Sequence, residues 1–406
     1  MPVKKKVLFL IPGLGAGGAE RSLSKLSLEI AKSHEVYVAV FNKLEGIAFP
    51  FGGTLIDLEI LGADSIAGKI SSFYNRVKKI KEIKKRLAID VCISFLEGAD
   101  YINLLTKGKE KVIISIRGSK TFDAEISGTI GWIRKKVLMP YLYKRADSIV
   151  AVSEGIKQEL IQDFNLDKNK IITIYNFYET KKILQLANEP LDAVYQHIFN
   201  GPVIINSGRL HIQKAHTQLL EVFALTRATT NVKLIIIGDG GLIMPLLEKA
   251  KELNLKAYWW NQQEEISSNY HVYFLGYQHN PFKFIQKAKL FAFSSSWEGF
   301  PNALAEAMIC GTPVITTDCP TGPREIMAPG TKPNFVLDKA EYTKFGVLMP
   351  LLNQNNDKVK LMWAATIDAL LEDENLRTYA KNAEMRMSDF TPETITNQWE
   401  RIINQQ

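Results

Sequence analysis

The chain of 406 residues is long enough for two domains, and its 46% hydrophobic and 23% charged residues are the composition of an ordinary globular protein. No apolar run approaches the ~20 residues that span a membrane, and three scattered cysteines are too few for a disulfide framework, which favours a reducing cytoplasm. The net charge of +7 is uneven: residues 1–200 carry 30 Lys and Arg against 22 Asp and Glu, so the first half should meet an anionic partner such as phosphate, acidic lipid or nucleic acid.

The chain opens on an apolar run that leads directly into a glycine-rich loop. Residues 7–12 are typical of a first strand rather than a signal peptide, and Gly13, Gly15 and Gly18 follow with G-x-G-x-x-G spacing before a helix over about 19–33. That spacing is typical of dinucleotide sites, yet the next strand ends near Lys43 without the acidic residue that would hold a ribose. The loop therefore predicts a helix N-terminus close to an anion. An NAD(P)-dependent oxidoreductase stays open as an alternative.

Strands and helices alternate through the first half. Apolar residues three and four positions apart predict an amphipathic helix within residues 69–89. Short apolar runs typical of buried parallel strands lie at 35–41, 90–96, 111–117, 148–152 and 170–176. The alternation predicts a doubly wound α/β domain, which we place at residues 1–180.

The pattern loosens between residues 177 and 201, where we expect a linker, and then the alternation resumes. Further strands are expected near residues 203–207, 232–237, 272–275, 290–294 and 313–317. The second doubly wound domain is placed at residues 181–387. Because such sheets bind ligands at the carboxyl ends of their strands, we expect two Rossmann-like domains that face each other across a cleft.

Charged residues in the second half collect just after these strands. Arg209 and Lys214 follow the first of them and would suit a diphosphate. Glu298 follows another, and Glu306 lies in a helix that Pro301 would begin. Carboxylates accept hydrogen bonds from hydroxyls, so this pair is suited to a sugar or a ribose.

The stretch "EGFPNALAEAMICGTPVI" carries Glu298 and Glu306 at the spacing E-x7-E, and it resembles the family-4 retaining glycosyltransferases of the GT-B fold. Four further segments look like that family and occur in its order: "GGAER" at 17–21, "SGRL" at 207–210, "IIGDGG" at 236–241 and "FLGYQHNP" at 274–281. The segment from about 388 to 406 is similar to the terminal helix that crosses back onto the first domain in this family. The resemblance covers nearly the whole chain.

The resemblance implies a role for each matching residue. Arg209 and Lys214 would hold the donor diphosphate, Glu298 would contact the transferred sugar, and Glu306 would bind the ribose hydroxyls. Further substrate contacts are implied for backbone or side-chain groups of Gly17, Gly18, Gly276, Tyr277, Gly299, Phe300, Pro301, Asn302 and Ala303. The glycine loop at Gly17 and Gly18 would then face a donor diphosphate, which explains the missing acidic residue.

The chain departs from the family at Arg117, where many relatives have a histidine. An arginine there could contact the donor sugar or the acceptor, but it cannot serve as a general base. No other residue is indicated as a nucleophile. The resemblance implies a front-face mechanism without a metal ion or cofactor, in which the leaving phosphate helps to deprotonate the acceptor.

The resemblance also implies the substrates and the place of action. "TGPRE" at residues 321–325 looks like that of bacterial members that use UDP-sugars on lipid-diphosphate-linked acceptors, in cell-surface glycan synthesis. Two basic segments, 76–86 and 132–145, are interleaved with apolar and aromatic residues, which is typical of helices at an anionic membrane surface. We therefore expect a cytoplasmic enzyme, peripheral at the inner face of the membrane. A nucleic-acid-binding protein is a second alternative, supported only by the basic first half and a pI of about 9.0.

Overall fold

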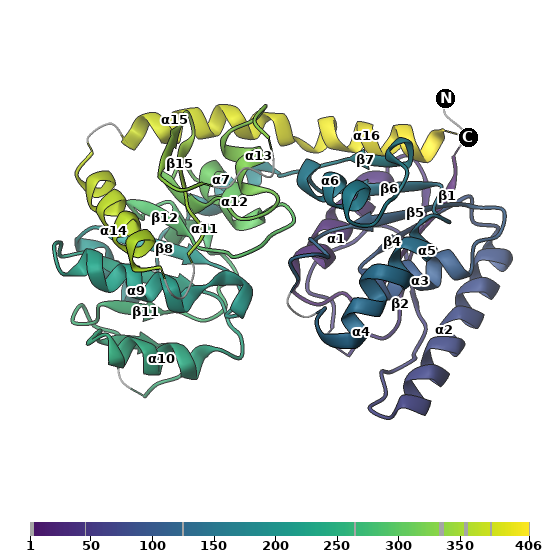
Figure 1. Ribbon diagram of the computed structural model, residues 1–406, viewed down its shortest axis with the longest axis horizontal. Helices are drawn as coiled ribbons and strands as arrows, with labels where there is room; N and C mark the ends of the chain where they lie inside the picture. Colours follow the sequence, from purple (N-terminus) through teal and green to yellow (C-terminus); the bar gives the residue numbers. More distant parts are fainter. Residues whose placement is uncertain are drawn as a thin grey trace. The chain divides into compact units, whose positions relative to one another are not determined.

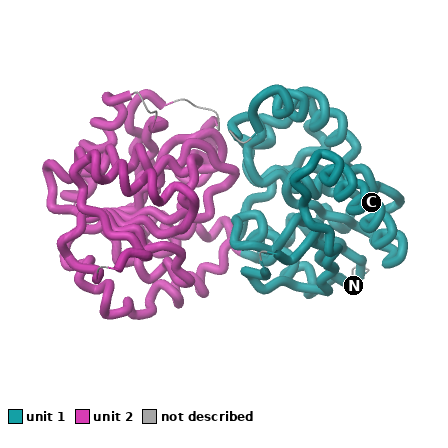
Figure 2. The backbone as a smooth tube through the Cα atoms, turned by 90° about the horizontal axis from the view of Figure 1, so that it is seen from below, with its two compact units in different colours: residues 1–177, 392–406 teal, residues 178–391 magenta. Residues whose placement is uncertain are grey.

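The protein consists of two compact units. The computed structural model describes residues 4–44, 46–123, 126–263, 265–332, 337–352, 356–373 and 376–405. Residues 1–177 and 392–406 make the first unit, and residues 178–391 make the second (Figure 2). The chain therefore passes between the units twice, after Phe177 and after Thr391.

The first unit is built on a seven-stranded sheet in the order β3-β2-β1-β4-β5-β6-β7 (Figure 1). All of its strand pairs are parallel. The central strands are almost fully buried, as expected when helices cover both faces of a sheet. The strands are β1 Lys6–Ile11, β2 Glu35–Val40, β3 Thr54–Asp57, β4 Val91–Phe95, β5 Lys111–Ile116, β6 Ser148–Ala151 and β7 Ile171–Thr173.

Helices cover both faces of this sheet. Buried residues of α1 and α16 pack with one face, and buried residues of α2 and α3 pack with the other. The helices are α1 Gly18–Ile30, α2 Ile66–Leu87, α3 Glu97–Leu105, α4 Gly128–Ile133, the π-helix η1 Arg134–Leu138, α5 Met139–Tyr143, α6 Glu154–Gln162, the 3₁₀ helix η2 Lys168–Lys170 and α16 Pro392–Asn404.

The last helix, α16, is an integral part of the first unit. Trp399 is 3% exposed, and its ring stacks on Phe95 with 6.4 Å between centroids. The Nε2 atom of His34 lies 2.8 Å from Glu400, and Lys5 donates to the carbonyl of Ile403 at 2.7 Å. Burial of this amphipathic face explains why the chain returns to the first unit at its end.

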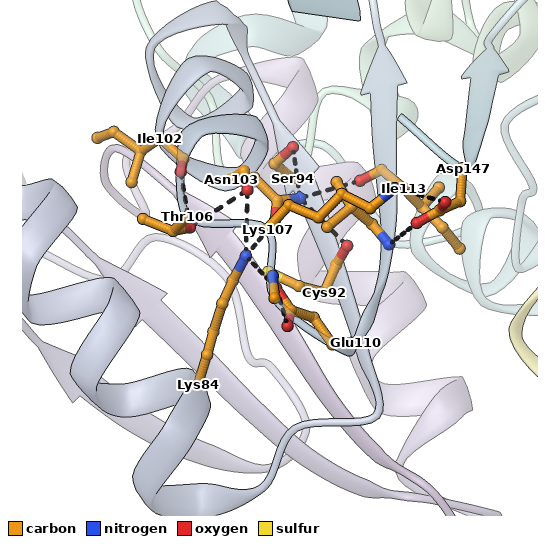
Figure 3. A network of polar contacts seen from close by, with 12 residues as sticks. Lys84, Cys92, Ser94, Ile102, Asn103, Thr106, Lys107, Glu110, Ile113 and Asp147 are labelled. Atoms are coloured by element: carbon orange, nitrogen blue, oxygen red, sulfur yellow. Dashed lines mark hydrogen bonds and ion pairs between the residues drawn. The ribbon is translucent and has the colours of Figure 1, made fainter. Parts of the chain in front are cut away.

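A buried polar network ties α2 to the sheet and to α3, and Figure 3 shows its side chains pointing toward one another. Lys84 donates to Asn103 Oδ1 at 2.8 Å and pairs with Glu110 at 2.8 Å. The Asn103 amide in turn donates to the carbonyls of Cys92 on β4 and Ile113 on β5. The side chains of Lys84 and Glu110 are only 4% and 5% exposed, so each neutralises a charge that would be costly to bury alone.

The second unit has an eight-stranded sheet in the order β10-β11-β9-β8-β12-β13-β15-β14. The strand pairs are parallel except β14–β15, which is an antiparallel hairpin. The strands are β8 Val203–Ser207, β9 Lys233–Ile237, β10 Ala257–Trp259, β11 Val272–Phe274, β12 Leu290–Phe293, β13 Val314–Thr317, β14 Glu341–Thr343 and β15 Gly346–Met349. The predicted pair of doubly wound α/β sheets is confirmed.

Its helices pack on the sheet around one large cluster that includes residues of α9, α10 and α14. The helices are α7 Thr180–Ala187, α8 Ala193–Gln196, η3 His197–Asn200, η4 Ile212–Lys214, α9 His216–Arg227, α10 Ile243–Glu252, α11 Phe282–Ile285, α12 Asn302–Ile309, α13 Pro323–Met327, α14 Asp357–Glu372, α15 Leu376–Met387 and η5 Ser388–Phe390.

The segment 177–201, which the sequence suggests as a linker, is instead largely helical. It contains α7, α8 and η3, and α7 packs against α11 and α12 within the second unit. Ile183 and Ile198 are buried there. These helices are short, so their apolar residues do not build up a visible period.

In the part of the chain that the structure describes, no helix combines the length and the hydrophobicity needed to cross a membrane.

Candidate functional site

The loops that follow β8 and β12 are joined by hydrogen bonds at the carboxyl edge of the second sheet. Ser294 Oγ donates to the carbonyl of Lys214 at 2.7 Å, and the Ser296 amide donates to the carbonyl of Gln213 at 2.8 Å. The Gln213 side chain donates to the carbonyl of Trp297 at 2.7 Å. Because β8 and β12 are neighbours in the sheet, these bonds hold the two loops in a fixed register.

Two of the predicted catalytic residues lie in direct contact at this edge. Lys214 Nζ is 2.6 Å from Glu298 Oε1, and the two side chains are 18% and 9% exposed. The ammonium also lies 5.3 Å from the centroid of the Phe293 ring. A lysine ammonium has three donors, so Lys214 can bind Glu298 and a further anion at the same time.

Arg209 belongs to the same loop as Lys214 and is exposed. The stem of Lys214 lies against Gly208, where an added Cβ would be 3.3 Å from Lys214 Cε. Arg209 has no hydrogen-bond or ion-pair partner among the described residues, so its guanidinium is available to an anionic ligand. The arrangement combines one exposed cation with one cation already held by a carboxylate.

The loop 298–302 is supported by the turn that precedes α13. Thr321 Oγ1 donates to the carbonyl of Glu298. Gly322 has a φ of 92°, and a Cβ at this position would lie 2.6 Å from Pro301 Cδ and 2.9 Å from the Gly299 carbonyl oxygen. Only glycine allows both this backbone conformation and this close approach.

Arg324 holds that turn through two ion pairs. Its guanidinium is buried and pairs with Asp318 at 2.6 Å and with Glu341 at 2.9 Å. Burial raises the pKa of the Asp318 carboxyl, although the Arg324 hydrogen bonds oppose that rise. The segment "TGPRE" therefore supports the loop that carries Glu298, through Thr321, Gly322 and Arg324.

Helix α12 begins at the end of the same loop. Pro301 is its N-cap and Asn302 its first residue, and the first turn is only half-buried at Asn302 and Ala303. Glu306 lies one turn further along and is 6% exposed, so it is a carboxylate largely enclosed by protein. Phe300 is buried, and its ring lies against the protein core rather than in solvent.

The loops after β8, β9 and β11 approach one another through glycines. The Gly238 amide donates to the Gly276 carbonyl at 2.8 Å, and a Cβ on Gly238 would collide with the Gly208 carbonyl oxygen. Gly276 has a φ of 66°, and its Cα faces the Trp260 ring. Tyr277, for which the resemblance implies a substrate contact, is 57% exposed next to this junction.

In the first unit, the predicted residues lie at the carboxyl edge of the other sheet. Gly17 is the N-cap of α1 and Gly18 its first residue, and the Glu20 carboxylate lies against Gly17. Arg117 follows β5, donates to Asn176 Oδ1 and lies 5.5 Å from the centroid of the Phe95 ring. The structure thus places Arg117 among protein partners at this edge.

One polar cluster at that edge is not singled out by the sequence analysis. Glu97 at the start of α3 accepts from Arg134 at 2.7 Å and from the Tyr101 hydroxyl. Asp100 is 1% exposed and accepts from Ser94 at 2.7 Å, and its burial raises its pKa to about 8. The signal available in the sequence is the run "LEGAD" directly after the strand "VCISF".

The described residues include no group of three or more His, Cys, Asp and Glu side chains placed to hold a metal ion. The three cysteines are buried and free.

Comparison with known proteins bears on both units. Residues 16–182 match the model of Glycosyltransferase Family 4, and residues 191–345 match that of Glycosyl transferases group 1. A glycosyltransferase of Methanocaldococcus jannaschii is 38% identical over 65% of this chain and 64% of its own, so the match spans just under two thirds of that relative. An N-acetylgalactosaminyltransferase of Campylobacter jejuni, named for a diphospho-undecaprenol substrate, is 28% identical over 95% of this chain and 96% of its own.

A solved structure supports the fold. HepE of Anabaena, in complex with UDP and glucose, has a TM-score of 0.73 at 19% identity, over 98% of this chain and 99% of its own. The oxidoreductase and nucleic-acid alternatives gain no support from any of these matches. The chain therefore belongs to the glycosyltransferases of the GT-B fold, with a family 4 domain followed by a group 1 domain.

Proposed function

We propose that this enzyme transfers a sugar, with retention and without a metal ion, from a UDP-sugar to a lipid-linked glycan acceptor in bacterial cell-surface glycan synthesis. The Campylobacter jejuni relative is named for a lipid-diphosphate-linked glycan, and HepE was solved with UDP and glucose. The observation that carries the proposal is the contact between Lys214 and Glu298, at the carboxyl edge of the second sheet, with Arg209 exposed on the same loop as Lys214.

These residues have complementary roles in the proposal. Arg209 and Lys214 bind the donor diphosphate and stabilise the negative charge that develops on it as the sugar leaves. Glu298 accepts a hydrogen bond from a hydroxyl of the transferred sugar, and Glu306 accepts from the ribose. The backbone N–H groups of Gly299, Phe300, Asn302 and Ala303 make further contacts with the transferred sugar, and the loop around Gly276 and Tyr277 contacts the base of the donor; Pro301 has no N–H to donate.

The proposed reaction uses the donor's own phosphate as the base. The bond between the anomeric carbon and the diphosphate oxygen breaks, and the acceptor oxygen bonds to that carbon on the same face. The acceptor proton passes to the departing phosphate oxygen. Arg117 orients the donor sugar or the acceptor, because a guanidinium stays protonated and cannot remove the proton itself. The amides of Gly17 and Gly18, at the N-terminus of α1, bind an anionic group of a substrate.

A donor screen tests the proposal. Hydrolysis of UDP-, GDP- and ADP-sugars should be measured for the wild type and for Glu298→Gln, with excess chelator in every reaction. We expect hydrolysis of a UDP-sugar that Glu298→Gln largely abolishes. Hydrolysis of a GDP- or ADP-sugar alone would contradict the assignment of the donor.

We further propose that the first unit rests on an anionic membrane at the cytoplasmic face, where it meets the acceptor. Six large apolar residues on α4, η1 and α5 are exposed: Ile130, Trp132, Ile133, Val137, Leu138 and Tyr141. Lys136 and Lys144 are exposed on the same stretch. An exposed apolar surface beside lysines is the chemistry of an interfacial helix.

The other basic helix, α2, has most of its exposed basic residues in its second half, at Lys78, Lys79, Lys81, Lys85 and Arg86. Of the basic residues on α2, Lys84 is buried against Glu110, and Arg76 lies 4.4 Å from the centroid of the Phe41 ring. Exposed apolar residues gather instead in its first half, at Ile66, Ile70 and Tyr74. The proposal therefore assigns membrane contact chiefly to residues 130–144.

Vesicle sedimentation tests this contact. Each basic residue near an anionic surface contributes about 1 kcal/mol, so Lys135→Glu with Lys136→Glu should weaken binding to anionic vesicles strongly. The matched control is Lys251→Glu with Lys256→Glu, two lysines of the second unit, which should bind like the wild type. Equal binding by both double variants, or no binding of the wild type at low salt, would contradict the proposal.

A further inference from the structure

Tyr178 and Phe390 flank the two points where the chain passes between the units, and they are bonded to each other. The amide of Tyr178 donates to the carbonyl of Phe390 at 2.9 Å. Both residues are 1% exposed. Tyr178 is the first residue of the second unit, and Phe390 is the last but one before the chain leaves it.

Both side chains reach the loop that carries Glu298. The Tyr178 hydroxyl donates to Asn302 Oδ1 at 3.0 Å. The Phe390 ring meets the Phe300 ring edge-on, with 5.3 Å between centroids and 62° between planes. Asn302 and Phe300 of the loop are thus contacted by residues that lie next to the two points where the chain passes between the units.

Arg386 connects these contacts with α13, whose preceding turn also supports the loop. Its guanidinium lies 4.6 Å from the centroid of the Phe390 ring and donates to the carbonyls of Glu325 at 2.7 Å and Ile326 at 3.0 Å. Those carbonyls belong to α13, whose preceding turn bonds to Glu298 through Thr321. The loop 298–302 therefore has two sets of supporting contacts, and Arg386 links the segments that make them.

We propose that Tyr178 and Phe390 are positioning residues for the donor sugar, which they place by fixing the loop 298–302 against Lys214. This role rests on the proposed function of Glu298. A carboxylate must keep its geometry within a fraction of an ångström to act in a transition state, whereas simple nucleotide binding depends less on this loop. Loss of either residue should therefore lower kcat more than it weakens binding of UDP.

The test compares two tyrosines of the second unit that each lose one hydrogen-bonded hydroxyl. Tyr178→Phe removes the hydrogen bond to Asn302. Tyr273 is also fully buried, and Tyr273→Phe removes a hydrogen bond of 2.7 Å to the carbonyl of Ser267. Transfer kinetics with a UDP-sugar, UDP affinity by calorimetry and the melting temperature are measured for both. We expect kcat to fall about fivefold to tenfold in Tyr178→Phe alone, the size of one hydrogen bond, with UDP affinity within about twofold of the wild type.

A double-mutant cycle adds a second readout. If Tyr178 acts through Asn302, then Asn302→Ala should remove the effect of Tyr178→Phe on kcat, because the bond is already lost. Additive effects on kcat, or a Tyr178→Phe enzyme with the same kcat as Tyr273→Phe, would overturn the positioning role. If the wild type binds UDP and transfers sugar, such a result overturns the positioning role alone. If the wild type is inactive toward every nucleotide-sugar, the proposed function and the positioning role both fail.

Discussion

Lys214 and Glu298 are 84 residues apart in the chain, and they form an ion pair of 2.6 Å at the carboxyl edge of the second sheet. The hydrogen bonds between the loops after β8 and β12 hold this pair, and Arg209 is exposed on the same loop as Lys214. Since Lys214 neutralises a carboxylate whose side chain is 9% exposed, Arg209 and Lys214 should respond differently to substitution.

Arg209→Ala should weaken UDP binding without affecting the fold. A charge-assisted hydrogen bond contributes about 1.5–3 kcal/mol, so the affinity should fall by roughly tenfold or more. Exposed residues without protein partners change the free energy of unfolding by only about 0.5 kcal/mol. Calorimetry with UDP and chemical denaturation measure the two quantities, and unchanged affinity would refute the assignment.

Lys214→Ala should weaken UDP binding and also destabilise the protein, because it leaves the Glu298 carboxylate buried without its partner. Lys214→Ala combined with Glu298→Gln should recover part of the lost stability but none of the lost affinity. A Lys214→Ala protein as stable as the wild type would show that the ion pair does not persist in solution.

Glu298→Gln should reduce turnover more than nucleotide binding, because its proposed partner is the transferred sugar. Glutamine keeps the shape and one acceptor oxygen but loses the charge. Steady-state kinetics with UDP calorimetry on the same preparation check this. A loss of UDP affinity as large as the loss of kcat would count against the role.

The buried ion pair Lys84–Glu110 should contribute to the stability of the first unit. Lys84→Met should cost about 3–5 kcal/mol of unfolding free energy, the usual range when one partner of a buried ion pair is removed. Lys85→Met is the matched control, because Lys85 is exposed on the same helix. Equal denaturation midpoints for the two variants would contradict the burial of this pair.

His216 makes the stability dependent on pH. It is fully enclosed at the start of α9, its Nε2 lies 3.0 Å from Asn206 Oδ1, and burial followed by the charge of Lys214 lowers its pKa to about 3. The unfolded chain takes up a proton below about pH 6.5 while the folded chain does not, so this group favours folding above pH 6.5 and its contribution is lost as the pH falls toward 3.

His216→Gln keeps a donor for Asn206 but cannot be protonated. Its unfolding free energy should fall less steeply between pH 6 and 4 than that of the wild type, by up to about 1.4 kcal/mol per pH unit. Denaturation series at three or four pH values measure the slopes. Parallel slopes would mean that His216 is protonated in the folded protein.

Both sheets and the loops of the candidate site could be predicted from the sequence, because buried parallel strands are short apolar runs and polar residues follow them directly. Arg209, Lys214 and Glu298 lie after such runs. The contacts of Tyr178 and Phe390 with the loop 298–302 could not be predicted from the sequence, since their partners lie 124 and 90 positions away and carry no local pattern. The helices within 177–201 are too short to show a period, and the strands β3, β10 and β14 lack the buried apolar run of most other strands.

The anomeric configuration of the transferred sugar distinguishes transfer with retention from transfer with inversion. A transfer reaction with a UDP-α-linked sugar, run in excess chelator, is followed by NMR of the product. We expect an α-linked product formed at an undiminished rate, because Arg209 and Lys214 stabilise the leaving diphosphate in place of a metal ion. A β-linked product, or loss of transfer in the chelator, would contradict it.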